Sequence, residues 1–284
     1  RIWAICRADN GGLGMQTHDF YKHMKPLKTL VVDISHLTGY KTHPDRYPGA
    51  QVAIGFEIDK PSIDAFLEGL DMVFTVECPY NHYLYEKARE MGVKTVCQYN
   101  WEWLAHHAEP HLPLPDLFLA PSTWHMKEMR KFGVPVKYLH VPIDRKLFPY
   151  KRRTKALTFL HIAGHTTMGD RNGTLLFLDA MARVQSDVKF IIRTQDDLPS
   201  NVSDHKLTVI KDDVKDHTKL YDGDVLILPR RYGGLSLQLN EAMSLGMVPI
   251  MLDVEPQSAF LHKKLLLQAY PNARTMIKTE VDVY

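Results

Sequence analysis

Short β-branched apolar runs alternate with helical patterns along most of this chain. IWAIC, TLVVDIS and MVFTVE in the first half, and LTFLHIAG, VKFIIRT and VLILPR in the second, are each followed by polar loops or helical periods. Strand, helix and strand in this cadence are typical of parallel sheets with helices on both faces. We therefore predict an α/β fold with doubly wound, Rossmann-like sheets, ending in a last helix near 257–270.

A polar and basic stretch interrupts the alternation. IDRKLFPYKRRTKA, residues 143–156, carries a proline and no apolar period, as linkers between domains do. We place the boundary near Pro149, which gives a first domain at 1–149 and a second at 150–284. Ligands of open parallel sheets bind off the carboxyl ends of strands, so we expect both domains to face a central cleft and their loops to carry the chemistry.

Composition narrows the function classes. The chain has 284 residues, of which 35 are basic and 33 acidic, and a formal net charge of +2. The electrostatic field of the whole protein is therefore too weak to attract nucleic acid or an anionic membrane strongly. No apolar run approaches the ~20 residues of a membrane helix, and three cysteines in apolar runs indicate reduced thiols. We expect a cytoplasmic protein. The chain lacks an initiating Met and ends in the strand-like TEVDVY, so we expect the natural protein to extend past one or both ends.

Three glycine-containing loops follow predicted strands. In the first, ADNGGLGMQTHDF, the amides of Gly12 and Gly14 open a helix, where free N–H groups and the helix dipole favour an anion. The spaced glycines and downstream acid of a dinucleotide fingerprint are missing, so a nicotinamide or flavin site is weakly supported. An ordinary tight turn is the alternative interpretation.

The second loop, HIAGHTTMGDRNG, places polar donors before a helix entered at Asn172. Thr166, Thr167 and Arg171 are these donors, with His165 as a further hydrogen-bonding residue, and the permanently charged guanidinium suits a diphosphate. The alternative is a solvated loop in which Asn172 caps the helix.

The third loop, RRYGGLSLQLNEAM, brings Gly233, Gly234, Leu235 and Ser236 to a helix that carries Glu241. An acid on an otherwise apolar helix face must be solvated or matched to hydroxyl donors, because an unpaired buried charge is costly. A ribose offers two adjacent hydroxyls. The alternative is a surface glutamate on an ordinary helix.

These loops, together with APSTWHMKEMRKFGVP, resemble the retaining nucleotide-sugar glycosyltransferases of GT-B fold, of the family 4 or "group 1" type. The resemblance covers most of the chain, strongly from about Asp116 onward and weakly in the acceptor half. The family's late motif is two Glu separated by seven residues in a Glu-Gly-Phe-Gly-Leu … Glu-Ala … Gly-x-Pro-Val frame. The matching positions are Gly234, Leu237, Glu241, Ala242, Gly246 and Pro249.

Two positions depart from this frame. The family's first acid, which touches the donor sugar, falls on Gly233, and its second loop glycine falls on Ser236. The family's basic pair falls on His165 and on Asn172 or its neighbour Arg171. The resemblance implies that Glu241 binds the ribose of the donor, while Arg171, Thr166 and the Gly12–Gly14 amides meet the diphosphate.

The resemblance is weaker in the first domain, which holds the acceptor side in this family. The family's histidine after the strand VKTVCQ is replaced here by Tyr99, Asn100, Trp101 and Glu102. His18 and Glu102, with His82, remain candidate catalytic residues, and each has a structural or solvent-facing alternative.

The resemblance implies transfer of a sugar from a nucleoside diphosphate donor to a hydroxyl acceptor, with retention and with neither metal nor further cofactor. The acceptor is a glycan, a lipid-linked sugar or a modified nucleic-acid base. Two alternatives stay open: a degenerate non-catalytic module that binds a nucleotide-sugar or glycan, and a GT-B-type epimerase.

Two further signals point away from metal chemistry. Asp222-Gly223-Asp224 precedes the apolar strand VLILP, which favours a turn over a metal-binding acid pair. His106, His107 and His111 lie in a proline-broken loop, which does not hold ligands well.

Overall fold

The computed structural model describes residues 1–38, 41–165, 169–198 and 204–284. The chain divides into two compact units, which are Arg1–Val141 with Met276–Glu280, and Pro142–Thr275 with Val281–Tyr284. The division comes before Pro149, because Ile143 and Phe148 already pack in the core of the second unit. The polar and basic stretch at 143–156 thus already contains core residues of the second unit, so its composition did not locate the domain boundary.

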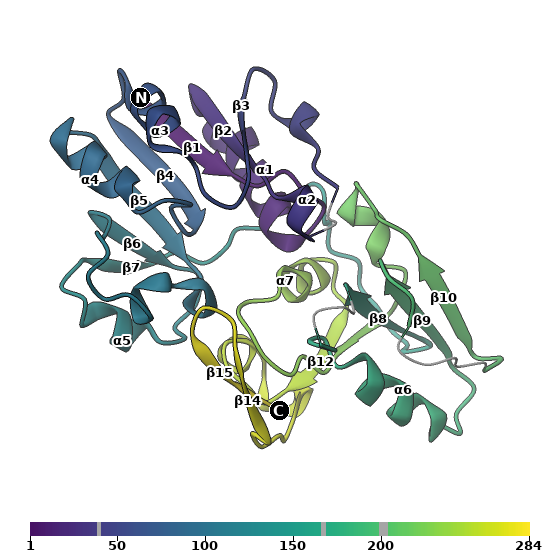
Figure 1. Cartoon of the computed structure of the whole chain (residues 1–284). Coiled ribbons are helices and arrows are strands. Elements are labelled where there is room, and N and C mark those ends of the chain that lie inside the picture. The colour runs from purple at the N-terminus through teal and green to yellow at the C-terminus, as the bar shows by residue number, and fades with distance from the viewer. Residues whose placement is uncertain (39–40, 166–168, 199–203) are drawn as a thin grey trace. The chain divides into compact units, whose positions relative to one another are not determined.

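Within the described residues, the first unit has a sheet of seven parallel strands in the order β3-β2-β1-β4-β5-β6-β7 (Figure 1). The strand order changes direction between β1 and β4, which is the topological switch point where such sheets bind ligands. The strands are β1 (Ile2–Cys6), β2 (Lys28–Asp33), β3 (Gln51–Ile54), β4 (Met72–Glu77), β5 (Lys94–Tyr99), β6 (Leu117–Ala120) and β7 (Val136–Tyr138). The helices are α1 (Gly12–Met24), α2 (Ser35–Thr38), α3 (Lys60–Leu67), α4 (Tyr83–Glu90) and α5 (Met126–Arg130).

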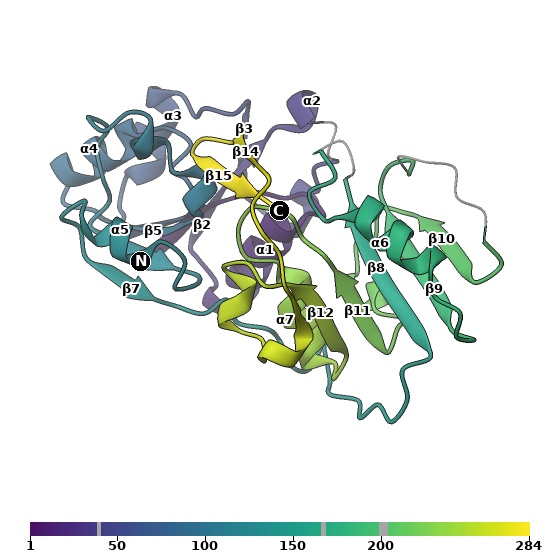
Figure 2. The same ribbon diagram turned by 90° about the horizontal axis from the view of Figure 1, so that it is seen from below.

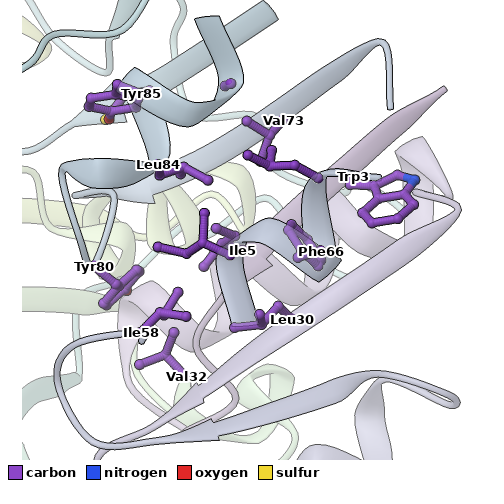
Figure 3. Packing of buried hydrophobic residues seen from close by; sticks show 14 of the residues in the cluster. Trp3, Ile5, Leu30, Val32, Ile58, Phe66, Val73, Tyr80, Leu84 and Tyr85 are labelled. Atoms are coloured by element: carbon purple, nitrogen blue, oxygen red, sulfur yellow. The ribbon is translucent and has the colours of Figure 1, made fainter. Parts of the chain in front are cut away.

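Most buried apolar side chains of this unit belong to one cluster, to which its strands and helices both contribute, and a smaller cluster includes Tyr47. Trp3 and Ile5 of β1 face Phe66 of α3 and Leu84 of α4, and all four are buried (Figure 3). The rings of Trp3 and Phe66 meet edge to face with centroids 4.8 Å apart, a favoured aromatic geometry. The near-continuous apolar runs seen in the sequence are thus strands buried on both faces.

The second unit repeats the same strand order on a smaller scale. Within its described residues, six parallel strands run β10-β9-β8-β11-β12-β13, so its switch point lies between β8 and β11. Figure 2 shows β8, β9 and β10 side by side, with α6 next to β8. The elements are β8 (Thr158–Gly164), α6 (Thr174–Ala182), β9 (Lys189–Thr194), β10 (Leu207–Lys211), β11 (Val225–Leu228), α7 (Leu237–Ser244), β12 (Val248–Leu252) and β13 (Leu266–Leu267).

The prediction of two Rossmann-like α/β sheets is confirmed, but the helix predicted at 257–270 is wrong. That segment holds the short 3₁₀ turns η6 (Gln257–Ala259) and η7 (Lys263–Leu265) and then β13, which pairs with β12. Pairing at the open edge of the sheet overrides the helical period of this leucine-rich segment. A two-stranded sheet, β14 (Ala273–Met276) with β15 (Glu280–Val283), ends the chain. The other 3₁₀ turns of the described residues are η1 (Pro44–Arg46), η2 (Trp101–Trp103), η3 (Ala105–His107) and η5 (His217–Leu220).

Candidate functional site

The two loops at the switch point of the second unit interlock. Arg171, in the loop after β8, donates from Nε to the carbonyl oxygen of Tyr232, 3.2 Å away, in the loop after β11. The amide of Arg231 donates in return to the carbonyl oxygen of Arg171 at 2.9 Å. The Arg171 guanidinium also lies over the Tyr232 ring, 5.9 Å from its centroid. The sequence placed these residues in separate loops, and the fold brings them together.

Glycines make this close approach possible. Gly173 has a φ of +72°, and a Cβ there would overlap the carbonyl oxygen of Pro229. Next to it, Arg230 donates from Nη1 to Oδ1 of Asn172 at 2.8 Å. Larger residues at 173 would push the two loops apart, so this glycine is required by packing as well as by its backbone conformation.

The guanidinium of Arg171 fills the space that a side chain at position 233 would need. Gly233 has a φ of +93°, and a Cβ built on it would lie 2.6 Å from both Cζ and Nε of Arg171. Any larger residue must displace the arginine. A cation therefore stands where the resembling family carries its first acid.

The entrance of α6 is occupied by a carboxylate of the chain itself. Asp170 accepts hydrogen bonds from the amides of Thr174 at 2.6 Å and Leu175 at 3.3 Å. The predicted use of this helix entrance for a diphosphate is wrong, because its first amides are already satisfied by an anion. The alternative cap by Asn172 is wrong as well, since its Nδ2 donates to the carbonyl oxygens of Ile162 and Ala163.

The entrance of α7 has a different character. Its N-cap, Ser236, makes no side-chain capping bond, and its first turn carries no acidic residue. Gly234 and Leu235 lead directly into this turn. The positive end of the helix dipole is therefore not offset by an acidic residue of the first turn, which favours an anionic ligand at this entrance.

Glu241 lies one turn inside α7 and is only 3% exposed. The Tyr221 hydroxyl donates a hydrogen bond to its Oε2, and Nδ1 of His217 lies 3.5 Å from its Oε1. Burial, and then the carboxylate, raise the pKa of Tyr221, so this phenol stays protonated as a donor. The surface-glutamate interpretation is wrong. Sequence reasoning missed Tyr221 and His217, because no fixed spacing links them to the motif.

His165 directly follows the last residue of β8. Nδ1 of His165 lies 3.3 Å from Oδ1 of Asp196, which follows β9. Thr166 and Thr167 lie outside the described residues. The site of the second unit is therefore built mainly from Arg171, Gly233 and α7.

The first loop of the first unit carries its own anion. Asp9 accepts from the amide of Gly11 at 2.8 Å and pairs with the buried Arg7 guanidinium at 2.6 Å. A Cβ on Gly14 would lie 2.8 Å from the backbone nitrogen of Asp9, so Gly14 permits α1 to pack against this loop. Gly12, in contrast, is exposed at the first position of α1. Of the two glycines predicted to bind a donor, Gly14 thus has a packing role of its own.

Two of the three candidate catalytic residues, His18 and Glu102, have structural surroundings. His18 packs edge to face on Tyr47 with centroids 5.7 Å apart. Burial, followed by the charges of Arg46 and Lys22, lowers the pKa of His18 to about 4, which leaves it neutral near pH 7. Glu102 is 3% exposed, and its backbone oxygen accepts from the amides at 278 and 279. Both residues therefore have roles in packing that need no substrate.

The described residues show neither a metal cluster nor a membrane helix. Among them, no group of three or more His, Cys, Asp or Glu side chains is arranged to hold a metal ion. In the same part of the chain, none of the helices has the length and apolar content needed to cross a membrane. Asp224 accepts from the amides of Leu157 and Thr158, as its predicted place at a turn before a strand requires.

Comparison with known proteins gives structural matches only. No protein-family model and no curated protein sequence matches the chain. A glycosyltransferase from Rickettsia africae matches with a TM-score of 0.64 at 9% identity, over 96% of this chain and 84% of the other. The catalytic domain of starch synthase IV from Arabidopsis thaliana, bound to ADP and acarbose, matches with 0.55 at 10% identity, over 94% and 88%. UGT2 from Phytolacca americana, complexed with UDP-2-fluoro-glucose and pterostilbene, matches with 0.53 at 10% identity, over 96% and 86%.

Sequence identities this low support a fold assignment but no statement about activity or substrate. The two parallel sheets with the same strand order and the matches over nearly the full chain agree on one architecture. The chain has the GT-B fold of glycosyltransferases.

Proposed function

We propose that this protein is a retaining, metal-independent glycosyltransferase that moves a sugar from a nucleoside diphosphate donor to a hydroxyl acceptor. One observation carries the proposal. From the loop after β11 into α7 there follow Gly233, with the Arg171 guanidinium of the neighbouring loop against it, then an α7 entrance without an acidic residue in its first turn, and then the carboxylate of Glu241. We assign the guanidinium to the transferred sugar and its phosphate, the α7 entrance to the diphosphate, and the carboxylate to the pentose of the donor.

The diphosphate is assigned to the α7 entrance. The amides at the start of α7 and the helix dipole meet the charge that develops on the leaving group as the glycosidic bond breaks. Arg171 adds a permanently charged guanidinium held against Tyr232, so it needs no reorientation during the reaction. This fixed positive charge supports leaving-group stabilisation by the protein, which is why we propose metal independence.

The ribose is assigned to Glu241. An ionised carboxylate has about four acceptor positions, and the Tyr221 hydroxyl takes one of them. Because Glu241 is only 3% exposed, the ribose hydroxyls must share it with Tyr221 and His217 or displace one of them. This requirement makes donor binding sensitive to both neighbours.

Calorimetric titration with UDP, GDP, ADP and dTDP tests donor binding. We expect one of them to bind, and the Glu241→Ala variant to lose about 1–3 kcal/mol of that affinity. Transfer is then followed with the matching nucleotide-sugar, and NMR of the product reports whether the anomeric configuration is retained. Binding of none of the four diphosphates would overturn the proposal, and an inverted product would overturn its retaining part.

A second candidate function is a non-catalytic module that binds a nucleotide-sugar or a glycan. It is favoured by Gly233, where Arg171 occupies the space of the acid that the resembling enzymes place against the donor sugar. Donor hydrolysis and transfer assays separate the two functions. Diphosphate binding without either reaction would support the module.

A further inference from the structure

We propose that one edge of the second unit is a docking surface for a lipid bilayer with anionic headgroups. The surface lies where the parallel strands of the second sheet begin, and we call it the amino-edge surface. Its members are the exposed side chains of Tyr150, Lys151, Arg152, Lys155, Leu157 and Val248. The inference goes beyond the proposed function and is independent of it, because no donor or acceptor takes part.

Contacts with the starts of neighbouring strands hold the segment before β8 along this edge. The amide of Lys151 donates to the carbonyl oxygen of Leu245 at 3.2 Å, in the turn that leads to β12. The Arg153 side chain turns inward, and its Nε donates to the carbonyl oxygen of Gly223 at 3.1 Å, just before β11. The segment ends at Leu157, directly before β8, and Figure 2 shows it as the loop that leads into the lower end of this strand. It therefore passes the starts of β12, β11 and β8 in turn.

Three apolar side chains of the amino-edge surface are open to solvent. Tyr150 is 65% exposed, Leu157 53% and Val248 42%. The Tyr150 ring lies against Gly246, where an added Cβ would meet its Cε2 atom at 2.8 Å, so the ring has a fixed support. Val248 is the first residue of β12 and is held by the sheet. Apolar groups that folding leaves in water gain free energy when an apolar layer covers them.

The segment before β8 concentrates positive charge. Its last thirteen residues contain six Lys or Arg and no Asp or Glu. Lys151, Arg152 and Lys155 among them are exposed. The net charge of the whole chain is only +2, so attraction to an anionic surface depends on such a local concentration, which acts within a Debye length of about 10 Å.

The acids that directly precede β11 have basic partners in the protein. Oδ1 of Asp224 lies 3.8 Å from Nε of Arg153, and Asp222 pairs with Arg193. Asp187, before β9, is an exposed acid of this edge, and the three exposed basic side chains of the amino-edge surface outweigh it. The local balance of charge is therefore positive.

A bilayer fits this composition better than a nucleic acid does. Proteins bind single-stranded nucleic acids through basic grooves and through aromatic rings on which the bases stack. Leu157 and Val248 cannot stack on a base, and Tyr150 is the one aromatic member of the amino-edge surface. An anionic bilayer offers both partners at once, because its headgroups attract Lys and Arg and its boundary layer takes up Tyr and Leu.

The candidate donor site lies at the opposite ends of the same strands. Gly233 and the α7 entrance follow the carboxyl end of β11, whereas the amino-edge surface lies before its first residue, Val225. A bilayer on this surface leaves the donor loops of the second unit uncovered. We therefore expect vesicle binding that needs no nucleotide.

Flotation with lipid vesicles tests the surface. The probes are vesicles of phosphatidylcholine alone and of phosphatidylcholine mixed with phosphatidylserine. We expect the wild-type protein to bind the phosphatidylserine vesicles at least about tenfold more tightly, because each basic side chain near the surface adds to the attraction. The combined variant Lys151→Gln, Arg152→Gln, Lys155→Gln should lose this preference. Leu157→Gln with Val248→Thr should keep the preference and bind both kinds of vesicle several-fold more weakly.

A charge-matched control comes from the same unit. Lys211→Gln, Lys215→Gln and Lys219→Gln together remove the same charge from exposed positions that are interspersed with acids, and should keep wild-type binding. Circular dichroism reports whether each variant is folded. Should the apolar variant fail to fold, the two lysine and arginine variants decide the proposal between them.

Several outcomes overturn the proposal. Equal binding of both kinds of vesicle by the wild type, or an equal loss in the control and in the Lys151, Arg152 and Lys155 variant, overturns the docking surface. Binding of a single-stranded oligonucleotide that this variant loses, without vesicle binding, assigns the surface to a nucleic acid instead. Wild-type affinity in the apolar variant overturns the role of Leu157 and Val248. None of these results bears on the glycosyltransferase proposal, which the diphosphate titrations test.

Discussion

The hydroxyl of Tyr221 donates a hydrogen bond to the carboxylate of Glu241, and both side chains are buried in the second unit. Tyr221 packs in the core of this unit, whereas Glu241 projects from α7 toward it. A buried charge without such a donor is costly, because its desolvation is not offset. The pair therefore links the stability of this unit to the group proposed to bind the ribose.

Replacing Tyr221 by Phe tests this link. The variant Tyr221→Phe leaves a buried carboxylate with one partner fewer, so we expect the free energy of unfolding of the second unit to fall by about 1–3 kcal/mol. Urea unfolding followed by circular dichroism measures the change. Tyr138→Phe removes a hydroxyl from an exposed ring and is the control. Equal stability of Tyr221→Phe and wild type would mean that the hydrogen bond is not made in solution.

The contact between Gly233 and Arg171 predicts a coupled pair of substitutions. Gly233→Ala must both strain a φ of +93° and displace the guanidinium, at a combined cost of about 1–3 kcal/mol. In an Arg171→Ala background only the backbone strain remains, so the added cost should shrink to roughly 1 kcal/mol. Urea unfolding of the four proteins forms a double-mutant cycle.

A matched control isolates the strain. Gly133 has a φ of +75°, and a Cβ added there would meet none of the described atoms within 4 Å, so Gly133→Ala reports the backbone cost alone. If the costs of Gly233→Ala and Arg171→Ala simply add, the two residues do not compete for one space.

The cap of α6 predicts a local loss of stability. Asp170→Ala removes the carboxylate that accepts from the Thr174 and Leu175 amides, and we expect a loss of about 0.5–2 kcal/mol. Asp179→Ala removes an exposed carboxylate from the same helix and should have little effect. Hydrogen exchange at the Thr174 amide locates the change, and unchanged protection there in Asp170→Ala would rule out the cap.

Much of the fold could be predicted from the sequence, because buried parallel strands leave apolar runs of a recognisable length. Helix α1, predicted to open at the first glycine loop, spans Gly12–Met24, and the strands fall on the runs that predicted them. The last helix was wrong, since the pairing of Leu266 and Leu267 with β12 depends on an open sheet edge that no local pattern records. Local periodicity fixes elements only where tertiary pairing does not compete with it.

Less of the candidate site than of the fold could be predicted from the sequence. Spacing singled out Glu241 and Arg171, but the partners that define their surroundings come from other elements: Tyr221 and His217 for the acid, Gly233 and Tyr232 for the arginine. A polar residue at the N-cap is a local signal for a helix start, but the N-cap of α6 is Gly173, and Asp170 stands four residues before the Thr174 amide, farther than the two or three residues over which an N-cap side chain acts. Contacts between loops of different strands have no such signal.

The buried His161 predicts how stability depends on pH. Its Nδ1 lies 2.9 Å from the Ile227 carbonyl oxygen and its Nε2 2.9 Å from the Thr174 hydroxyl, and its side chain is fully buried. Burial lowers the pKa of His161 from 6.5 to about 4. Between these two values the unfolded chain binds a proton that the folded chain does not, so stability falls as the pH drops from 6.5 toward 4.

Comparison with a variant isolates this contribution from that of the other titrating groups. The full effect of His161 is on the order of 3 kcal/mol, at 1.36 kcal/mol for each unit of pKa shift. His161→Gln cannot titrate, so its free energy of unfolding, measured in urea at pH 7 and pH 4.5, should decrease less than that of the wild type over this interval. His205→Gln, at an exposed position, should keep the wild-type pH dependence. Parallel pH profiles for His161→Gln and the wild type would mean that the imidazole is protonated in the folded protein, and that solvent reaches it.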